Sequence, residues 1–558
     1  MDNLSLVLQQ AYRESGDQVA VYLMHPREPD RAITYRELIE GSAGCAHALS
    51  EAGIRPGEVV IQIFMHGADL IFSFYGAMLH GAIPSILPHL TEKLSPEVYR
   101  RSLAALIQVT KPAAIITYPE FEPEIDKAVK PGDSVRAVLV AKRVSPVRDP
   151  NLGEWSGLAR AAEDIVLLQH SSGTTGLQKG VALSHQAVFN QLESYAEAIA
   201  LTPRDVIVSW LPLYHDMGLI AGFILPILSR VPLVLMSPLD WVRAPVKLMQ
   251  AISKYRGTLA WLPNFAYNFC AQKIRDRHLE GVDLSSWRAV INCSEPIYWK
   301  SHQAFLSRFE PYGFRAEALA TSYAMAENVF GVTQSGIHEP VAIDLVDKRS
   351  FQQGRVAQPA SGTESALRVV SSGVPIRNTH IRVLDEKQRD VPERHFGEIA
   401  LQSDCMLTGY YNRPDLNETA FVGDWYLTGD IGYVVGDELY VTGRKKDLII
   451  VGGRNIYPQD LESLAGEVKG VHAGRMVAFG LYSEDLGSEE VVVIAEADTE
   501  DPEDRRRIAD EIRQKVTTGS DVALRYVQVV ERNWLIKTSS GKIARSANRD
   551  KYLSHFTQ

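Results

Sequence analysis

His170-Ser-Ser-Gly-Thr-Thr-Gly-Leu-Gln-Lys179-Gly180 is the stretch that decides the fold of this 558-residue chain. It directly follows the apolar run 165–168, which predicts a strand ahead of a glycine-rich loop. The glycines allow backbone N–H groups to converge on an anion, and Lys179 adds a positive charge. Further donors are the hydroxyl groups of Ser171, Ser172, Thr174 and Thr175. The stretch therefore predicts a strand followed by a phosphate-binding loop.

This loop is not a Walker A loop, although Lys179 follows Gly173 at the Walker A distance. Gln178 stands where that motif has a glycine, and Gly180 replaces the Ser/Thr that would hold magnesium. A flexible surface turn is the alternative interpretation. The preceding strand and the density of hydrogen-bond donors favour a binding loop.

Up to about residue 440, short apolar runs alternate with amphipathic helical segments. Runs of this length with apolar residues on both faces are typical of parallel strands covered by helices. The runs are 59–64, 113–117, 137–140, 165–168, 206–210 and 289–291. The sequence also predicts the start of one helix, because Thr34 and Glu37 form a capping-box pattern ahead of the run 38–49. The fold class predicted for this part is α/β.

The pattern of predicted secondary structure changes after about residue 377. Strands joined by tight turns predict an antiparallel meander over 381–384, 398–401, 431–435 and 439–442. Beyond Asp447 we expect a small α+β unit, with strands near 476–479, 490–494 and 526–530 and a helix over 502–516. The predicted organisation is a large N-terminal domain (1–443), a hinge (444–447) and a small, mobile C-terminal domain (448–558).

Composition narrows the class of protein. With 45% hydrophobic and 23% charged residues, the chain has the balance of a soluble globular protein. A net charge of −10 predicts no nucleic-acid partner. The four cysteines form no CxxC pair and the N-terminus has no signal-peptide pattern, so we expect a cytoplasmic protein. The most apolar stretch, 219–236, is broken by Pro226 and Pro232, which predicts a buried helix, turn and strand and no membrane span.

Four further motifs occur in order after the glycine-rich loop. They are Tyr323-Ala-Met-Ala-Glu327, Trp425-Tyr-Leu-Thr-Gly-Asp430, Gly443-Arg444-Lys-Lys446-Asp447 and Lys537-Thr-Ser-Ser-Gly-Lys542. Over nearly the whole chain this set resembles the adenylate-forming superfamily, which includes acyl-CoA synthetases, nonribosomal peptide adenylation domains and luciferases. The resemblance implies activation of a carboxylic acid as acyl-AMP, with ATP and Mg²⁺ as cofactors.

The resemblance also assigns roles to individual residues. Glu327 and Thr174 would hold Mg²⁺, which prefers hard oxygen ligands. Lys542, Glu327 and His215 would be catalytic, and Lys446 would be the hinge about which the small domain turns. Taken alone, Glu327 and Lys542 would be solvated surface charges. The implied ATP-binding residues are Ser171, Ser172, Gly173, Thr174, Thr175, Gly176, Lys179, Ser294, Glu295, Pro296, Ser322, Tyr323, Ala324, Asp430, Arg444 and Lys542.

The chemistry implied by the resemblance is attack of a carboxylate on the α-phosphorus of ATP. Negative charge develops on phosphoryl oxygens, so a fixed cation such as Lys542 stabilises the transition state. Asp430 could accept hydrogen bonds from the ribose hydroxyls, and Arg444 could approach the same sugar. No protein nucleophile is required.

Within the superfamily the chain is most similar to fatty acyl-AMP ligases. The residues that carry this likeness are Trp210-Leu-Pro-Leu-Tyr-His215-Asp-Met-Gly218, Pro263-Asn-Phe-Ala-Tyr267, Gly453-Arg454-Asn-Ile-Tyr-Pro-Gln-Asp460 and the long segment 330–372. The likeness implies transfer of the acyl group to the phosphopantetheine thiol of a separate acyl carrier protein. It also implies that segment 330–372 restrains the small domain and disfavours coenzyme A. Alternatives are an acyl-CoA ligase of the same fold, an amino-acid adenylating enzyme and a catalytically inactive binding protein.

The acyl pocket implied by the resemblance has an unusual wall. Its residues are Trp210, Met217, Gly218, Trp261, Asn264, Phe265 and Ile291. Members of this branch often have small residues just before Pro-Asn-Phe-Ala, whereas this chain has Trp261 and Leu262. A bulky wall would shorten the tunnel and favour short, medium or compact acids. The alternative is that Trp261 simply packs into the core. Other departures are Ala324 in place of glycine, and Cys293-Ser294 in place of Gly-Ala.

Overall fold

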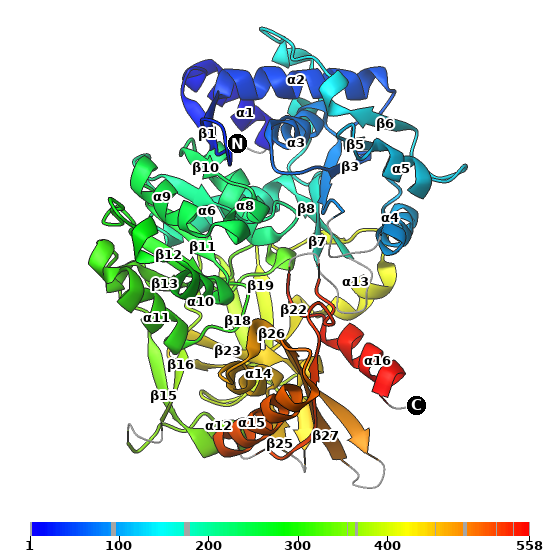
Figure 1. Cartoon of the computed structure of the whole chain (residues 1–558). Helices are drawn as coiled ribbons and strands as arrows, with labels where there is room; N and C mark the ends of the chain where they lie inside the picture. The colour runs from blue at the N-terminus through cyan, green and yellow to red at the C-terminus, as the bar shows by residue number, and fades with distance from the viewer. Residues whose placement is uncertain are drawn as a thin grey trace.

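The computed structural model describes residues 3–90, 96–171, 179–353, 355–362, 366–451, 454–483, 488–520, 522–538 and 541–556. Figure 1 shows two sheets with helices in the upper part of the molecule, a meander below them and a small unit at the lower end. Residues 172–178 of the glycine-rich loop lie outside the described ranges, and so does the side chain of Ser171. In the described part of the chain, no helix is long and apolar enough to cross a membrane.

The first sheet is parallel throughout, with strand order β4-β3-β5-β6. Its strands are β3 (Val59–Ile63), β4 (Ile83–Leu87), β5 (Ala114–Thr117) and β6 (Ala137–Val140), as the sequence predicts for three of them. The accompanying helices are α1 (Leu4–Ser15), α2 (Tyr35–Glu51), α3 (Ala68–His80), α4 (Pro96–Thr110) and α5 (Glu122–Ala128). In α2, Thr34 Oγ1 accepts from the backbone N–H of Glu37 at 3.2 Å, which is half of the predicted capping box. The Glu37 carboxylate pairs with Arg31 instead of completing the box.

The second sheet has the order β13-β12-β11-β9-β10-β1-β2, and only β1 and β2 pair antiparallel. Its strands are β1 (Val19–Leu23), β2 (Arg31–Thr34), β9 (Ile207–Ser209), β10 (Leu233–Leu235), β11 (Leu259–Leu262), β12 (Ala289–Asn292) and β13 (Leu319–Thr321). Helices near this sheet are α6 (His185–Ala198), α7 (Leu225–Leu228), α8 (Pro238–Arg243), α9 (Val246–Tyr255), α10 (Asn264–Lys273) and α11 (Trp299–Phe309). A π-helix, η4 (Met217–Ile224), precedes α7, so the predicted helix, turn and strand over 219–236 are confirmed.

The strand before the glycine-rich loop corrects one prediction. β7 (Ile165–Ser171) is antiparallel to β8 (Lys179–Ser184), and β20 (Gly409–Tyr410) pairs with the other edge of β8. The sequence predicted a parallel strand because the run is apolar on both faces. The hairpin is apolar because Leu168 and Ala182 pack against Val59 and Ile83 of the first sheet. Burial on two faces, and not parallel pairing, produced the apolar run.

The predicted meander is confirmed as an antiparallel sheet. Its strands are β18 (Thr379–Leu384), β19 (Gly397–Ser403), β21 (Phe421–Val422), β22 (Trp425–Val435) and β23 (Glu438–Arg444), with α13 (Pro414–Ala420) before β21. Segment 330–372 adds β14 (Thr333–Gln334), β15 (Ile343–Asp347), α12 (Lys348–Gln353) and β16 (Ala366–Val370), and β17 (Val374–Pro375) follows it. In this segment β15 and β16 form an antiparallel pair.

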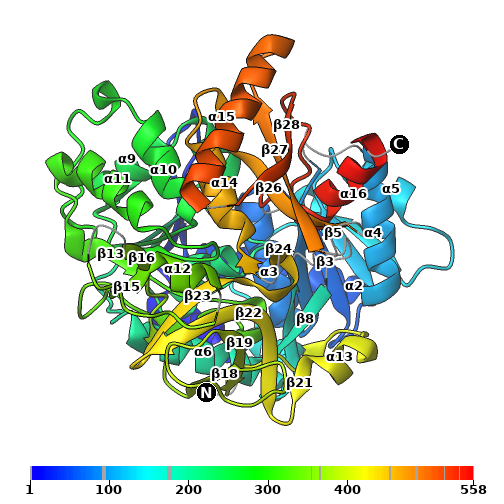
Figure 2. The same cartoon turned by 90° about the horizontal axis from the view of Figure 1, so that it is seen from below.

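A small α+β unit follows the meander, as predicted. Its sheet, β26-β27-β28, has one antiparallel and one parallel pair. The elements are β24 (Ile449–Val451), β25 (Arg454–Ile456), α14 (Pro458–Gly466), β26 (Val471–Ser483), β27 (Ser488–Ala497), α15 (Pro502–Ser520), β28 (Leu524–Val530) and α16 (Arg545–Phe556). Its two apolar clusters contain only residues from Ile449 onward, and the largest cluster of the molecule ends at Leu439. In the view from below, the small unit covers the centre of the large one (Figure 2).

Candidate active site

A carboxylate with two partners lies where the end of β23 pairs with the middle of β22. Asp430 on β22 is paired in register with Arg444 on β23, and Arg444 Nε lies 3.1 Å from Asp430 Oδ1. The hydroxyl of Tyr323 donates to Asp430 Oδ2 at 2.5 Å. Burial, together with the adjacent carboxylate of Asp430, raises the pKa of Tyr323 well above its usual value. Tyr323 therefore stays a neutral donor, and the Asp430 carboxylate is held in a fixed orientation.

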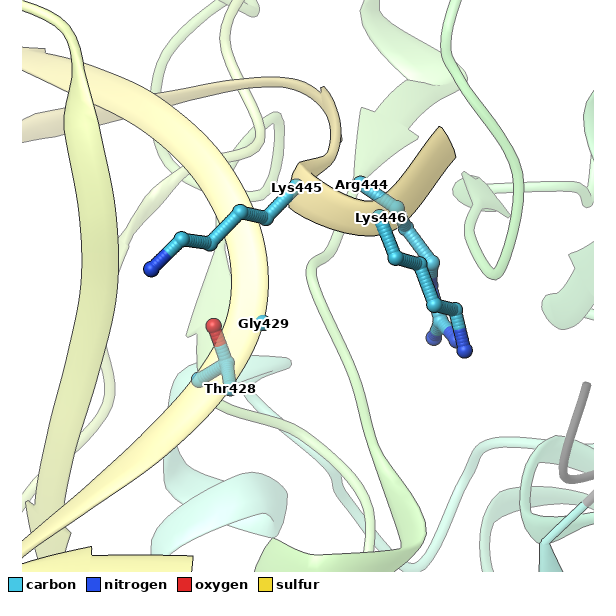
Figure 3. A pocket seen from close by; sticks show the side chains of 5 residues that line it. All are labelled: Thr428, Gly429, Arg444, Lys445 and Lys446. Carbon is cyan, nitrogen blue, oxygen red and sulfur yellow. The ribbon is translucent and has the colours of Figure 1, made fainter. Parts of the chain in front are cut away.

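A pocket of about 240 Å³ opens beside this pair. It is lined by Thr428, Gly429, Arg444, Lys445 and Lys446 (Figure 3). The side chains of Arg444 and Lys446 extend to the same side, whereas Lys445 points away and pairs with Glu398 at 2.8 Å. Burial and the nearby Arg444 charge lower the pKa of Lys446. Two cations directed to one side of a pocket favour an anionic ligand there.

Glu327 lies in a short 3₁₀ turn, Ala326–Asn328, and faces a pair of tyrosines. The hydroxyl of Tyr410 donates to Glu327 Oε1 at 3.0 Å and lies 2.9 Å from the hydroxyl of Tyr426. The Lys179 ammonium sits 4.8 Å from the centre of the Tyr410 ring. Burial raises the pKa of Glu327. A divalent cation would offset that penalty, and carboxylate oxygens are the ligands that Mg²⁺ prefers, so this residue fits a magnesium site.

A second charged cluster combines residues from both units. His215 Nδ1 lies 2.5 Å from Asp216 Oδ1, and Asp216 also accepts from the backbone N–H of Met217 at 2.8 Å. Burial opposes ionisation of Asp216, but the charges of His215 and Lys542 hold its pKa below the usual range. Burial raises the pKa of the Cys293 thiol to about 12, and Lys542 acts in the opposite direction. Lys542 of the small unit thus lies within electrostatic reach of two residues of the large unit.

The backbone around Lys542 has the shape of a tight turn. Gly541 has a φ of +88°, which favours glycine, and the N–H of Lys542 donates to Thr538 Oγ1 at 3.2 Å. The N–H of Thr538 donates to the carbonyl of Lys542 at 2.7 Å. These bonds orient the turn that carries the lysine.

The segment after β12 connects the predicted ATP site to the predicted acid pocket. Ser294 adopts a φ of +71°, and its hydroxyl lies 3.8 Å from Met217 Sδ. Glu295 Oε2 accepts from the backbone N–H of Phe265 at 3.0 Å, and Pro296 follows. Ser322 and Ala324 flank Tyr323, and the Ser322 hydroxyl donates to the carbonyl of Thr333.

Two stacked indoles dominate the predicted acid pocket. Trp210 stacks on Trp241 with ring centres 3.6 Å apart, and Phe265 meets both edge-on. Gly218 has no room for a side chain, because a Cβ there would lie 2.2 Å from the carbonyl of Pro212. Asn264 Oδ1 accepts from Asn292 Nδ2 at 3.1 Å. The two remaining predicted wall residues, Trp261 and Ile291, are register partners on β11 and β12.

The structure brings together most predicted residues and adds others. Glu327, Asp430, Arg444, Lys446, His215 and Lys542 belong to one electrostatically coupled region. The roles of these six residues stay predictions. Ser172 to Gly176, including Thr174, lie outside the described part of the chain, so their roles stay predictions as well. Sequence reasoning missed Asp216, Tyr410, Tyr426 and Trp241. Asp216 and Tyr426 could have been found because they lie inside quoted motifs, after His215 and after Trp425, whereas Tyr410 and Trp241 have no motif around them.

The small unit contacts the large unit through α14 and its flanks. The hydroxyl of Tyr298 donates to the carbonyl of Gln459 at 3.4 Å, and Lys300 pairs with Glu467 at 2.9 Å. Arg545 binds Asp447 and Glu462 at 2.8 and 2.7 Å. Burial, with the Glu462 charge nearby, raises the pKa of Asp460 to about 7.

The two-unit architecture and the lysine that reaches across it define an enzyme of the adenylate-forming fold. The model of a family described as AMP-binding enzyme matches residues 8–411, and the chain belongs to that family. A medium-chain-fatty-acid–[acyl-carrier-protein] ligase, JamA of Moorena producens, is 28% identical over 99% of this chain and 95% of its own length. A 4-hydroxyphenylalkanoate adenylyltransferase of Mycobacterium marinum is 30% identical over 89% of this chain and 82% of its own length.

Solved structures agree with this assignment. A chain from a study of fatty acyl-adenylate ligases of E. coli and L. pneumophila has a TM-score of 0.90 and 26% identity, covering 100% of this chain and 99% of that one. A fatty acid AMP ligase from Legionella pneumophila has a TM-score of 0.75 and 28% identity, covering 100% and 96%. Within its family, the chain is therefore similar to fatty acyl-AMP ligases.

Proposed function

We propose that this enzyme activates a carboxylic acid as acyl-AMP and transfers the acyl group to the phosphopantetheine thiol of a separate acyl carrier protein. The observation that carries the proposal is the electrostatic influence of Lys542, a residue of the small unit, on Asp216 and Cys293 of the large unit. A lysine supplied by the small unit would put a positive charge where the acid and the α-phosphate would meet. ATP is the nucleotide substrate of this reaction.

The large unit offers the groups that ATP needs. Asp430 lies beside the pocket, with one carboxylate oxygen on Arg444 and the other on Tyr323, and each oxygen has a further lone pair that could accept a hydrogen bond from a ribose hydroxyl. Arg444 and Lys446 face the pocket and would meet the negative charge of the nucleotide. Glu327, with Thr174, would hold Mg²⁺, whose charge neutralises the developing pyrophosphate when it is bound.

The first half-reaction forms one bond and breaks one. A carboxylate oxygen of the acid attacks the α-phosphorus, and the bond from that phosphorus to the bridging oxygen breaks, with pyrophosphate taking the electron pair. Lys542 stabilises the charge on the α-phosphoryl oxygens. His215, held against Asp216, would orient the carboxylate.

In the second half-reaction the carrier thiol attacks the acyl carbon. The thiol loses its proton, the acyl C–O bond to phosphate breaks, and AMP leaves with the electron pair. We propose that the small domain (448–558) turns about the hinge 444–447, at Lys446, to let this thiol enter. Apart from one cluster that joins Tyr457 to Tyr433 and Tyr440 of the meander, the apolar clusters of the small unit contain only residues from Ile449 onward, which supports a division of the chain at this place.

Segment 330–372 supports a carrier protein over coenzyme A as the acceptor. Phe351 of α12 packs 5.8 Å from Tyr457, which lies just before α14, and both belong to one apolar cluster with Tyr433 of the meander. Lys348 Nζ donates to the carbonyl of Gly519 at the end of α15. The segment therefore fastens the small unit at two places, as a restraint on its movement requires.

Acid-dependent exchange of pyrophosphate into ATP tests the first half of the proposal. Exchange should require both Mg²⁺ and a suitable acid from a broad panel that includes medium-chain and hydroxyphenylalkanoic acids. Failure of every acid would contradict adenylation. Offering coenzyme A and a holo acyl carrier protein together tests the second half, and preferred coenzyme A acylation would identify an acyl-CoA ligase instead.

A further inference from the structure

A buried asparagine bridges the two sides of the turn that carries Lys542. Asn548 lies at the end of the first turn of α16 and is fully buried. Its Oδ1 accepts from the backbone N–H of Ile536 at 2.8 Å, and its Nδ2 donates to the carbonyls of Ile536 and Ala544, both at 2.8 Å. Ile536 comes before the lysine and Ala544 comes after it, so one side chain joins the two ends of the turn.

Backbone hydrogen bonds close the same base of the turn. The N–H of Ala544 donates to the carbonyl of Ile536 at 3.0 Å, and Lys537 and Ile543 form an isolated β-bridge. The N–H of Asn548 donates to the carbonyl of Ala544 at 3.0 Å. The side chain of Asn548 therefore adds its three bonds to groups that the backbone already brings together, and it fixes their spacing.

A second buried side chain holds the segment that leads into the turn. Glu496 on β27 is fully buried, and its Oε1 accepts from the backbone N–H of Leu535 at 2.7 Å. Leu535 and Tyr552 of α16 belong to one apolar cluster with residues of the small sheet. The turn is thus attached to the core of the small unit through both β27 and α16.

The residue type at position 548 is informative. Asn548 and Tyr552 lie one helical turn apart and are the buried residues of α16. Asparagine disfavours a helix interior, and a buried amide is costly unless its polar atoms are hydrogen-bonded. The three bonds to Ile536 and Ala544 offset that cost. The turn, and not the packing of the helix, accounts for an asparagine at this place.

We propose that Asn548 is a positioning residue, which holds the turn so that Lys542 reaches the α-phosphate in the first half-reaction. This inference rests on the proposed function. A lysine carries its charge on a flexible four-carbon stem, so the backbone of the turn sets the region that the ammonium can reach. Misplacement of a reacting group by about 1 Å can lower a rate about a hundredfold. Asn548 acts only through Lys542 and does not touch the substrate.

The test measures both half-reactions in the full chain and in Asn548→Leu, which keeps the approximate shape of the side chain and removes its three hydrogen bonds. Acyl-AMP formation, followed by pyrophosphate exchange, should fall by about tenfold or more. The loss should appear in kcat, with KM for ATP within a fewfold, because Lys542 acts in the transition state. Thioester formation from supplied acyl-AMP should change by a fewfold at most.

Two comparisons separate positioning from loss of stability. In a Lys542→Ala background, Asn548→Leu should lower acyl-AMP formation no further, because the group that it positions is already absent. Tyr552→Leu disturbs the same helix face, where the tyrosine ring packs on Phe479, but it leaves the bonds of Asn548 in place. It should leave the ratio of the two half-reactions unchanged. Asn548→Ala, with a better helix former, is the second variant if Asn548→Leu folds poorly.

Amide hydrogen exchange gives a readout that does not depend on catalysis. The N–H of Ile536 donates to Asn548, and the N–H of Lys542 donates to Thr538 Oγ1 within the turn. Both amides should exchange faster in Asn548→Leu and Asn548→Ala than in the unaltered protein. The amides of β27 should keep their exchange rates, because the variants leave the sheet intact.

Unchanged acyl-AMP formation in an Asn548→Leu or Asn548→Ala variant that still melts cooperatively would overturn the proposal. Equal losses in the two half-reactions, or a further loss of the same size in the Lys542→Ala background, would also overturn it, because either shows an effect on folding alone. Failure of every acid to support exchange in the unaltered enzyme would instead contradict the proposed function. Unchanged amide exchange in the variants would then overturn the role of Asn548 as well.

Discussion

Lys542 differs from the other cations near the site because it comes from the small unit. Replacing it with alanine removes the charge that we propose stabilises the phosphoryl oxygens, and loss of one such group typically lowers kcat by about 10² to 10³. We expect Lys542→Ala to suppress acyl-AMP formation by this factor, while thioester formation from supplied acyl-AMP falls much less. The two half-reactions are measured by pyrophosphate exchange and by acylation of the carrier.

The matched control is Lys537→Ala in the same turn. Lys537 Nζ donates to the carbonyl of Gly474 within the small unit, so its removal should affect both half-reactions by a fewfold at most. Equal losses in the two steps with Lys542→Ala would contradict the role given to that lysine.

The raised pKa of Glu327 predicts that magnesium binding depends on pH. Burial raises its pKa, so protons compete for the carboxylate at higher pH than for an exposed glutamate. The apparent affinity for Mg²⁺ should therefore weaken as the pH falls through that raised pKa. Measuring the Mg²⁺ dependence of exchange at several pH values checks this. Glu327→Gln should need more Mg²⁺ and lose the pH dependence, whereas the exposed Glu339→Gln should change neither. A dependence that survives in Glu327→Gln would assign it to another group.

For single residues, the sequence predicted the chemistry of the side chains better than the contacts that they make. The motifs identified the charged groups of the site, because residues of these types seldom occur in this order for another purpose. These motifs contain Tyr323, Glu327, Asp430 and Arg444. The sequence did not predict the hydrogen-bond partner of Glu327. Tyr410 reaches Glu327 only because β20 pairs with β8, and no local pattern around Tyr410 signals that distant pairing.

Helix α14 carries a titratable group into the contact between the two units. The pKa of Asp460 is raised to about 7, by burial first and then by Glu462, with Tyr298 of the large unit nearby. A raised carboxyl pKa means that the folded state favours the protonated form. Its stabilising contribution is complete below the unfolded value near pH 4, and it is lost as the pH rises to about 7.

Asp460→Asn mimics the protonated form and gives the measurement. Melting temperatures of the two proteins should diverge between about pH 4 and 7, with the variant more stable, and the difference should stay constant above pH 7. The exposed Asp498→Asn serves as the control and should show no such divergence. A constant difference over the whole range would show that the carboxyl group does not titrate in this window.

The contact between helix α12 and the small unit predicts that a substitution in this helix changes the preferred acyl acceptor. Phe351→Ala removes the ring that packs on Tyr457 and should free the small unit from segment 330–372. Acylation of coenzyme A should then rise relative to acylation of the carrier protein, because the restraint on the small unit is weakened. Competition between the two acceptors measures the ratio, and the neighbouring exposed residue gives the control Arg349→Ala. An unchanged ratio in a stable Phe351→Ala variant would remove the basis for this role of the segment.

Part of the element order was predictable. Apolar runs located β3, β5 and β6 of the first sheet, β9, β10 and β12 of the second sheet and four strands of the meander, since burial and period mark them. The same runs misassigned β7, because burial on two faces does not distinguish a packed hairpin from a parallel strand. The capping box at Thr34 formed only by half, because Arg31 on the adjacent strand competes for Glu37.

Across the whole molecule, the sequence predicted two units and their order but not how they meet. The pattern of apolar and polar residues changes where the meander ends, and this change can be read from neighbouring residues alone. The contacts of Tyr298, Lys300 and Lys348 with the small unit join residues far apart in the chain. Such pairings depend on the complete fold, so no motif encodes them.

The separation of the apolar clusters has a consequence for how such enzymes diversify. The wall of the acid pocket belongs to the largest cluster, whereas the two clusters of the small unit share no residue with it. Substitutions of wall residues that enlarge or shrink the room for the acid therefore change no residue of those two clusters. We expect the choice of acid and the choice of acceptor to be separable. Chimaeras that exchange residues 448–558 between relatives should retain the acid preference of the parent that supplies residues 1–447.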